Sequence, residues 1–250
     1  MPVVVVTGAS SGIGAAAAEH LAGRGMSVVL VARRLEALED VAARSEGRAT
    51  AIAADMTIRS EVRRVVDETL ARFDAIDVWI NNVGRGVTCA PSELTDDDVD
   101  AMVRVNVMSA LYGMQEVLPH MKRRNDGQII NISSLLGRLP FAVNRSAYCG
   151  AKHFLNALTT TFRLEVQATH PGIQVTLVSP GVVRTDFGRN ALHGGPDSRE
   201  LPESQSAEEV AAVIADVIAT RQPDVYTRPG AQARVAGYYS VVGVDPGMIR

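Results

Sequence analysis

The chain has 250 residues, of which 46% are hydrophobic, 21% charged and 4% aromatic. This composition excludes an intrinsically disordered protein and predicts a core built mainly from Ala, Val, Leu and Ile. The formal net charge of −3 offers no basic surface for nucleic acid or for an anionic membrane. No apolar stretch reaches the roughly 18 residues of a spanning helix and the first residues lack signal-peptide features, so we expect a cytoplasmic protein.

The cysteines and histidines show no metal-binding spacing. Cys89 and Cys149 are far apart in the sequence, and the five histidines are scattered. We therefore expect neither a disulfide framework nor a metal site, and a reducing compartment fits best. Cys149 directly follows Tyr148, but adjacent side chains of a helix point in different directions. We therefore expect a structural role for Cys149.

Short β-branched runs alternate with longer Ala-rich amphipathic stretches, a pattern typical of strand–helix–strand units in a parallel sheet. Right-handed crossovers would wind these units into one doubly wound α/β sheet with helices on both faces, in a single domain over residues 1–250. We expect seven strands, at Val3–Val6, Ser27–Ala32, Ala49–Ala53, Ile76–Asn81, Gln128–Ser133, Gln174–Ser179 and Val225–Thr227. The interval rich in Gly, Pro and Ser, at about 186–206, predicts a substrate loop within the domain and not a linker.

A glycine-rich turn follows the first strand and leads into the helix-forming run Ala15–Ala22. Glycines allow positive φ and close approach of a ligand, and a helix N-terminus favours a diphosphate. A structural turn would use the same residues, but the position between a strand and a helix favours a dinucleotide site. The candidate binding residues are Gly8, Ser10, Ser11, Gly12, Ile13 and Gly14.

The end of the second expected strand carries Arg33 and Arg34 and no carboxylate. In a dinucleotide-binding sheet this position faces the adenosine ribose, where an acidic residue would select NAD(H). Two guanidinium groups suit a 2′-phosphate instead, so the sequence predicts NADP(H) over NAD(H). The alternative is that both arginines only solvate the start of a helix.

Two further strand ends carry candidate cofactor contacts. Asp55 and Met56 follow the third strand, where Asp55 would lie near the adenine amino group or else cap a helix that starts near Ser60. Asn82, Val83 and Gly84 follow the fourth strand. Ligands of open α/β sheets bind at the carboxyl ends of the strands, which is where all of these residues fall.

Tyr148 and Lys152 are four residues apart at the start of a long expected helix. This spacing puts both side chains on one face, with Cβ atoms about 5–6 Å apart. A nearby ammonium, together with an oxidised nicotinamide ring, would favour the phenolate and make the tyrosine an acid/base at neutral pH. Ser133 and Ser134 end the fifth strand close by.

These motifs resemble the short-chain dehydrogenase/reductase family, in the family's order and from the first strand to about residue 187. The resemblance implies a Rossmann-like fold and a compact one-domain branch of the family. The matching positions are Thr7-Gly8 with Gly12-Ile13-Gly14, Asn82 with Gly84, Asn106, Ser134, Tyr148 with Lys152, and Pro180-Gly181 with Thr185.

The resemblance also implies a role for each position. Tyr148 would transfer a proton to or from the substrate oxygen, and Lys152 would lower the pKa of Tyr148 and hold the nicotinamide ribose. Ser134 would hydrogen-bond the substrate oxygen, and Asn106 would lie mid-helix and bind a water that connects Lys152 to solvent. The residues expected to border the nicotinamide are Pro180, Gly181, Val183 and Thr185.

Two positions depart from the family pattern. Val83 replaces the usual small alanine, which would crowd the nicotinamide side. Ser134 lies 14 residues before Tyr148, one more than the common spacing, so the segment Leu139–Arg145 would absorb an extra residue. Ser133 is therefore a weaker alternative to Ser134.

The sequence thus predicts an NADP(H)-dependent carbonyl reductase or alcohol dehydrogenase with a Ser-Tyr-Lys-Asn site. The expected substrate is an apolar ketone, aldehyde or 3-oxoacyl group, in a pocket formed by the substrate loop and by Val87, Leu135, Leu136, Leu139 and Phe141. The alternatives are an NAD-dependent alcohol dehydrogenase of the same family and a regulator that senses NADP(H) without chemistry. The resemblance further suggests a homodimer or homotetramer paired through the helices near 102–122 and 146–169, and the tail 228–250 would close a pocket or cover a neighbour.

Overall fold

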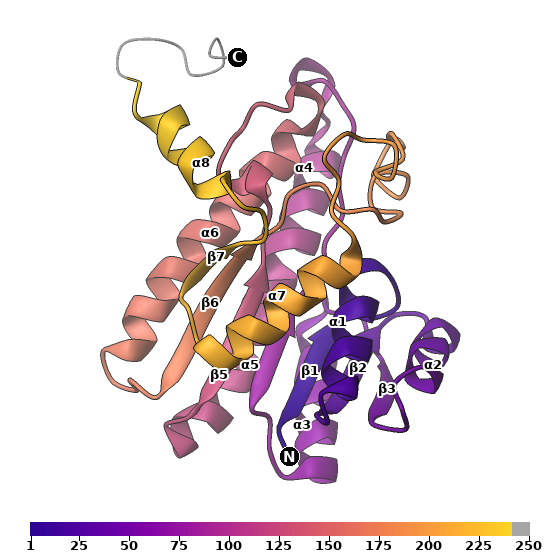
Figure 1. The fold of residues 1–250 in the computed structure, drawn as a ribbon, viewed down its shortest axis with the longest axis vertical. Helices are drawn as coiled ribbons and strands as arrows, with labels where there is room; N and C mark the ends of the chain where they lie inside the picture. Colours follow the sequence, from indigo (N-terminus) through magenta and orange to yellow (C-terminus); the bar gives the residue numbers. More distant parts are fainter. Residues whose placement is uncertain (242–250) are drawn as a thin grey trace.

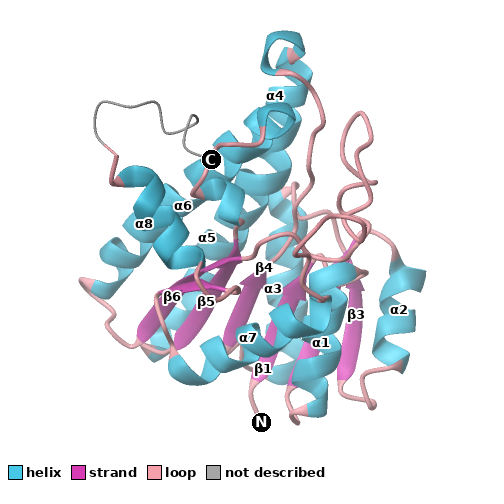
Figure 2. Ribbon diagram, turned by 45° about the horizontal axis from the view of Figure 1, so that its top comes forward, coloured by secondary structure: helices cyan, strands magenta, loops and turns pink. Residues whose placement is uncertain are grey.

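The structure is a computed structural model that describes residues 1–241. Its centre is a seven-stranded, fully parallel sheet in the order β3-β2-β1-β4-β5-β6-β7 (Figures 1 and 2). The expected α/β fold, Rossmann-like with seven parallel strands, is therefore confirmed. The strands are β1 (Val3–Thr7), β2 (Ser27–Ala32), β3 (Ala49–Ala53), β4 (Val78–Asn81), β5 (Gly127–Ile132), β6 (Ile173–Ser179) and β7 (Asp224–Tyr226).

Helices cover both faces of the sheet. One face packs against α1 (Gly12–Gly23), α2 (Leu35–Ala43) and α7 (Ala207–Thr220), and Figure 2 shows α1 and α7 side by side. The other face packs against α3 (Arg59–Phe73), α5 (Ser109–Arg124) and α6 (Ser146–Gln167). Two further helices, α4 (Asp96–Val103) and α8 (Ala231–Tyr239), lie beyond the carboxyl edge of the sheet.

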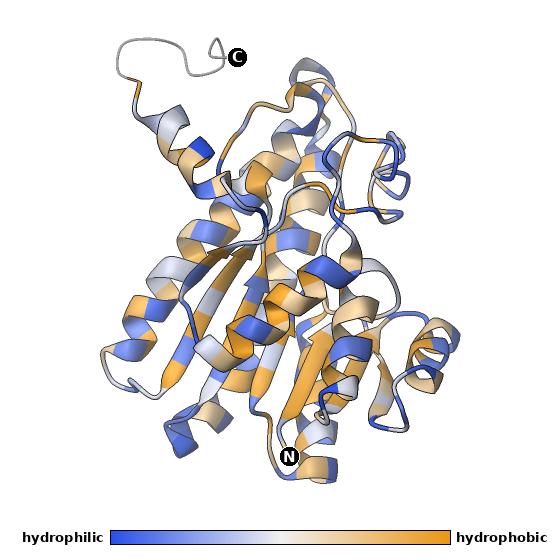
Figure 3. Ribbon diagram, in the orientation of Figure 1, coloured by the Kyte–Doolittle hydropathy of each residue, from blue (hydrophilic) through white to orange (hydrophobic). Residues whose placement is uncertain are grey.

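The central strands are apolar on both faces because both faces are covered (Figure 3). Val4 and Val6 of β1 belong to the core under α1 and α7, whereas Val5 between them belongs to the core under α3, α5 and α6. In β4, Trp79 is fully buried in that second core. Strand alternation thus divides one sheet between two hydrophobic layers.

The expected strand ranges hold to within two residues, and β4 shows why they shift. We expected this strand to begin at Ile76, but it begins at Val78. The amide of Ile76 donates to Nε2 of His120 (3.2 Å), and the Asp77 carboxylate accepts from the amide of Val3 (2.8 Å). At Ile76 a side-chain partner thus replaces the strand ladder, whereas the Asp77 backbone already bonds to Val3 and Gln128 (both 2.9 Å).

The order of the strands creates a crevice between β1 and β4. The chain proceeds from β1 to β2 in one direction and returns to the other side of β1 for β4. Such a switch point leaves a gap between the connections at the carboxyl ends of the strands, where open α/β sheets bind ligands. This is the upper edge of the sheet in Figure 1, opposite the N-terminus.

The expected tail contains α8, which packs on the segment after β5. Tyr239 donates its hydroxyl hydrogen to the carbonyl of Arg138 (2.8 Å), and Arg234 lies over the Phe141 ring (5.1 Å to the centroid). The remainder of the tail, residues 242–250, lies outside the described residues. No helix within residues 1–241 is long and apolar enough to cross a membrane.

Candidate active site

The glycine-rich turn between β1 and α1 has the backbone shape that its glycines predict. Gly8 and Gly12 have φ of +66° and +56°, which L side chains rarely adopt. A Cβ on Gly14 would collide with the carbonyl oxygen of Gly8, so α1 approaches the turn as closely as a glycine permits. Ser11 precedes α1 in an extended conformation and its side chain does not cap the helix. The first amides of α1 are therefore left for an anion, as a diphosphate requires.

Asn82 holds this turn against the end of β4. Its Nδ2 donates to the carbonyls of Thr7 and Gly8 (both 3.2 Å), and its backbone amide donates to the Thr7 hydroxyl (3.0 Å). A Cβ on Gly8 would lie 3.2 Å from the amide nitrogen of Val83. The Asn82 side chain thus fixes the glycine-rich turn against the carboxyl end of β4.

The residues expected at the adenosine end lie at the carboxyl ends of β2 and β3. Arg33 and Arg34 are exposed, and within residues 1–241 neither forms an ion pair. The Asp55 carboxylate accepts from the amide and hydroxyl of Thr57 (2.9 and 2.8 Å). It does not cap the next helix, because α3 begins at Arg59 after Ile58 without a side-chain cap, so that alternative is wrong. Met56 is buried.

Tyr148 and Lys152 lie together in the first turns of α6, and both are buried. Lys152 Nζ is 5.9 Å from the centroid of the Tyr148 ring and donates to the carbonyl of Ile132 at the end of β5 (2.9 Å). Ser134, just beyond β5, is also buried and is placed to hydrogen-bond the Tyr148 hydroxyl. The structure therefore brings these three predicted catalytic side chains to one point.

The hydroxyl of the neighbouring Ser133 is hydrogen-bonded to another side chain. Ser133 donates its hydroxyl hydrogen to Oδ1 of Asn156, whose Nδ2 donates in turn to the carbonyl of Gly137 (2.7 Å). The Ser134 hydroxyl lies beside Tyr148, and its oxygen also accepts from the amide of Leu136 (3.1 Å). The geometry thus favours Ser134 over Ser133 as the hydroxyl available to a substrate.

Asn106 lies in one widened helical turn, Arg104–Met108, that joins α4 to α5. Its Nδ2 donates to the carbonyls of Arg85 and Met102 (2.9 and 3.0 Å), and its Oδ1 accepts from the Arg85 amide (3.2 Å). A Cβ on Gly84 would lie 3.1 Å from this Oδ1 and 3.6 Å from Lys152 Nζ. Asn106 therefore holds the chain after β4 beside Lys152, and single widened turns of this kind recur at functional sites.

A chain of buried hydrogen bonds fixes α6 to the sheet beneath the site. Trp79 Nε1 donates to Oδ1 of Asn81 (2.7 Å), and Asn81 Nδ2 donates to Oδ1 of Asn131 (2.8 Å). Asn131 Nδ2 donates to the Thr159 hydroxyl (2.9 Å). Because every member of this chain has a hydrogen-bond partner, the network holds α6 in a single position on β4 and β5.

Burial is the main cause of the pKa shifts of Tyr148 and Lys152. It raises the pKa of Tyr148 to about 12, with Ser134 and Arg145 opposing that rise. It lowers the pKa of Lys152 to about 7. The expected depression of the Tyr148 pKa by Lys152 is not produced by this chain alone, because burial also drives the lysine toward its neutral form.

Residues 180–185, which follow β6, were expected to border the nicotinamide. The Pro180 carbonyl accepts from the amide of Leu135 (2.7 Å), and Thr185 Cγ2 would lie 3.1 Å from a Cβ on Gly12. Val183 is buried and pairs with Gln205 at the far end of the substrate loop. A Cβ on Gly181 would lie 2.7 Å from Cδ of Arg228. Of these four predicted residues, Thr185 lies against the glycine-rich turn, and the other three contact Leu135, Gln205 and Arg228.

The substrate loop covers Tyr148. The Phe187 ring lies 5.5 Å from the Tyr148 ring, centroid to centroid, and Leu192 pairs with Val87 beside them. Val87 and Leu139, expected to line the pocket, are fully buried, whereas Phe141 is half exposed and lies beside Arg234 of α8.

Sequence reasoning missed Arg145, whose guanidinium lies among these residues. Its position three residues before Tyr148 at the start of the same helix was the available signal.

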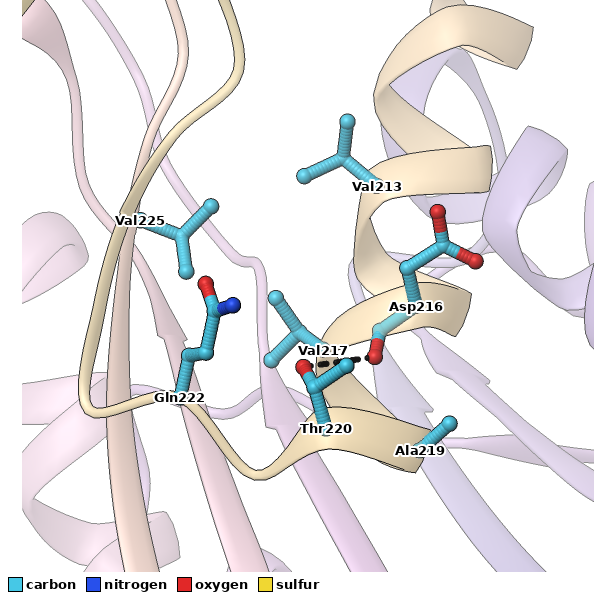
Figure 4. A pocket seen from close by; sticks show the side chains of 7 residues that line it. All are labelled: Val213, Asp216, Val217, Ala219, Thr220, Gln222 and Val225. Carbon is cyan, nitrogen blue, oxygen red and sulfur yellow. Dashed lines mark hydrogen bonds between the residues drawn. The ribbon is translucent and has the colours of Figure 1, made fainter.

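The surface hollow in Figure 4 lies elsewhere. It is lined by residues of the carboxyl end of α7 and of the segment into β7, including Val213, Asp216 and Gln222. Its hydrogen bond, from the Thr220 hydroxyl to the Asp216 carbonyl (2.9 Å), belongs to the helix itself. Within the described residues, no group of three or more His, Cys, Asp or Glu side chains is arranged to hold a metal, and Cys89 and Cys149 are free.

Comparison with known proteins agrees with this geometry. Residues 2–194 match the short chain dehydrogenase family. An uncharacterized oxidoreductase of Staphylococcus saprophyticus is 38% identical over 211 residues, which cover 81% of this chain and 88% of that protein. A short-chain dehydrogenase structure from Streptomyces avermitilis has 32% identity and a TM-score of 0.84, over 96% of this chain and 94% of the other. One from Sphingobium yanoikuyae, in complex with NADPH, has 29% identity and a TM-score of 0.83, over 96% and 93%.

The chain belongs to the short-chain dehydrogenase/reductase family. It is an oxidoreductase that uses a nicotinamide cofactor, and the resemblance drawn from the motifs is confirmed.

Proposed function

We propose that this protein is a carbonyl reductase that uses NADPH, with Tyr148 as the proton donor. The observation that carries the proposal is the meeting of Tyr148, Ser134 and Lys152 at the carboxyl edge of the sheet, beside the glycine-rich turn. The alternative of a cofactor sensor without chemistry leaves this buried set of side chains without a purpose.

The residues around the crevice fit a dinucleotide along its whole length. The free amides at the start of α1 suit the diphosphate, and the exposed Arg33 and Arg34 suit a 2′-phosphate. Lys152 would hold the nicotinamide ribose, and the segment 180–185 would flank the ring. When bound, the reduced nicotinamide supplies a hydride to the substrate carbon.

Tyr148 is protonated at neutral pH because burial raises its pKa to about 12. A protonated phenol can donate to a carbonyl oxygen, while the Ser134 hydroxyl holds the same oxygen in place. The protonated form is the one that the reductive direction uses. Lys152, whose pKa falls to about 7, gains its charge most readily when an anionic cofactor lies beside it.

The substrate we propose is an apolar ketone, an aldehyde or a 3-oxoacyl group. The surfaces nearest Tyr148 are Phe187, Leu136 and Leu192, which are apolar. Each additional buried methylene contributes about 0.8 kcal/mol, so along a series of methyl ketones kcat/KM should rise roughly three- to fourfold per carbon until the pocket is full. Such a series with NADPH oxidation as the readout tests this, and cofactor binding without turnover of any carbonyl would instead support the sensor.

The cofactor preference is tested by titrating the protein with NADPH and NADH and following cofactor fluorescence. Arg33→Ala and Arg34→Ala should each weaken NADPH binding about 10- to 100-fold, the value of a hydrogen bond to a charged group, and leave NADH binding unchanged. Arg123→Ala, an exposed arginine near the amino edge of the sheet, is the matched control. Equal affinity for both cofactors would mean that the two arginines face solvent, and an NAD-dependent enzyme would replace this proposal.

We also propose a homo-oligomer paired through α6, in a reducing, cytoplasmic setting. Phe154 and Leu164 on this helix are more than half exposed, at 53% and 64%. Two large apolar side chains on one helix favour burial against a second copy. Light scattering of the wild type and of Phe154→Glu measures this, and a monomeric wild type would contradict it.

A further inference from the structure

The side chain of Arg145 lies half-buried in the candidate site and has no hydrogen-bond partner among the described residues. Its Nη1 is buried and forms no hydrogen bond there. Within residues 1–241 no carboxylate forms an ion pair with it, and the opposite charges that act on it are those of Tyr148 and Cys149 in their ionised forms. Burial accordingly lowers the pKa of Arg145. Even a half-buried cation without a counter-ion costs free energy, and an anionic ligand beside it would offset that cost.

Two glycines make room for this guanidinium. A Cβ on Gly86 would lie 2.5 Å from Nη1, and a Cβ on Gly195 would lie 2.8 Å from Nη2. Gly86 belongs to the segment after β4, and Gly195 belongs to the substrate loop. The backbones of these segments are joined by hydrogen bonds from Thr88 to Leu192 and from Leu192 to Gly86 (both 2.9 Å). Arg145 thus reaches between two elements that both border the substrate.

A second polar atom at the same place also lacks a partner. The Thr88 hydroxyl oxygen is buried and has no hydrogen-bond partner within the described part of the chain. It would lie 2.9 Å from a Cβ on Gly195, the same position that is 2.8 Å from Arg145 Nη2 and 2.6 Å from the carbonyl oxygen of Gly188. A guanidinium and a hydroxyl that converge in this way offer several donors to one small anionic group.

This group of donors adjoins the reacting position. The Arg145 charge lowers the pKa of Tyr148, so the two side chains are within electrostatic reach of each other. The Phe187 ring, which faces Tyr148, is 3.2 Å from the Cβ position of Gly86. A substrate whose carbonyl oxygen meets Tyr148 would therefore extend past Phe187 toward Arg145.

We propose that Arg145 and Thr88 bind a carboxylate of the substrate, so that the preferred substrates are oxo acids with an apolar body. The inference rests on the proposed function and narrows its substrate class. The reaction itself is unchanged: the carbonyl carbon gains the hydride of NADPH, the carbonyl oxygen gains the proton of Tyr148, and the nicotinamide is oxidised. The carboxylate keeps its charge throughout and serves to orient the carbonyl.

The test compares substrates of equal length that differ only at the end far from the reacting carbonyl. The compounds are 4-oxopentanoate, 4-oxopentanamide and 2-hexanone, and 2-oxopentanoate and 5-oxohexanoate vary the spacing between the two groups. We expect at least one oxo acid to exceed its uncharged analogue at least tenfold in catalytic efficiency. The readout is the ratio of the efficiency with an oxo acid to that with the neutral ketone, so a general change in activity cancels. Arg145→Met should bring this ratio to about one, and Arg145→Lys should retain part of it. Arg123→Met, distant from the site, controls for the change in net charge.

A binding measurement keeps the inference independent of turnover. Pentanoate should raise the melting temperature of the protein saturated with NADP⁺ more than pentanamide does, and Arg145→Met and Thr88→Val should abolish this difference. Reduction of 2-hexanone with no preference for any oxo acid, in wild type and Arg145→Met alike, would overturn the carboxylate site and leave the proposed function intact. Failure to reduce any carbonyl, with the pentanoate effect still present, would overturn the proposed function alone.

Discussion

The imidazole Nε2 of His193 lies 2.7 Å from Oδ1 of Asp98 and ties the substrate loop to the first turn of α4. Asp98 is itself held by Thr95, whose amide and hydroxyl both contact its other carboxylate oxygen. The Phe187 ring of the same loop covers Tyr148. A substrate that reaches Tyr148 must therefore enter while this contact, or another part of the loop, is open.

Removing the imidazole should loosen the loop. His193→Ala is expected to speed trypsin cleavage after the exposed Arg189 and Arg199 by roughly three- to tenfold, since one largely exposed hydrogen bond, worth about 1 kcal/mol, is lost. The measurement is limited proteolysis followed by mass spectrometry. His170→Ala, whose exposed ring contacts only Thr169 among the hydrogen-bonding groups of residues 1–241, is the control. Identical cleavage rates in wild type and His193→Ala would show that the loop is held by other contacts.

Tyr148→Phe removes the proton donor and keeps the ring. We expect kcat to fall about 10²- to 10⁴-fold, the usual contribution of a positioned acid, with NADPH affinity changed less than threefold. Ser134→Ala should lower kcat less and raise KM, because it removes a hydrogen bond to the substrate oxygen. Steady-state kinetics with cofactor titration separates the two effects. Retained turnover in Tyr148→Phe would assign the proton transfer to another group.

Lys152 should limit the stability of the cofactor-free protein in a pH-dependent way. Burial lowers its pKa from 10.5 to about 7, so the fold disfavours the charged form. The penalty is complete below pH 7 and fades as the pH rises toward 10.5, because the unfolded chain then also loses the proton. Lys152→Met should therefore raise the melting temperature most at pH 6 and least at pH 10. The fluorescence of the single tryptophan, the buried Trp79, reports the unfolding.

A pH-independent difference between the Lys152→Met variant and wild type would contradict the burial of a titrating ammonium. Lys152→Met is also expected to be inactive at every pH, so the stability gain and the activity loss arise from the same substitution.

Two glycines at opposite ends of α1 give matched substitutions. A Cβ on Gly14 would collide with the Gly8 carbonyl, whereas a Cβ on Gly23 meets nothing within 4 Å. Gly14→Ala should displace the glycine-rich turn, destabilise the protein by about 1–3 kcal/mol and abolish cofactor binding. Gly23→Ala should leave binding unchanged and stabilise by up to about 1 kcal/mol. Chemical denaturation and NADPH titration measure both, and normal NADPH affinity in Gly14→Ala would exclude a tight turn at the diphosphate.

Local sequence signals predict most of the framework. The runs of valine in β1 and β2 and the alternating cores they enter follow from strand geometry alone. The glycine-rich turn can be predicted from the sequence because positive φ values and close backbone contacts require glycine. The proximity of Tyr148 and Lys152 can be predicted because residues four apart lie on the same face of a helix.

What escapes sequence reasoning depends on long-range packing. The start of β4 is shifted by His120, a residue of α5 that no local pattern connects with Ile76. The enclosure of Arg145 requires Gly86 and Gly195 to meet across the substrate loop. The strong burial that reverses the expected pKa shift of Tyr148 likewise arises from segments far away in the chain.

The widened turn Arg104–Met108 holds one residue more than a regular α-helix, and its closing bond runs from the Ser109 amide to the Arg104 carbonyl. Deleting one residue here would close a regular helical turn and leave α4 and α5 in nearly the same register, because the widening absorbs the extra residue. The contact of Asp98 with His193 would remain, whereas Asn106 would lose its bonds to Arg85. The extra residue is thus what brings the Asn106 amide to the chain beside the catalytic lysine.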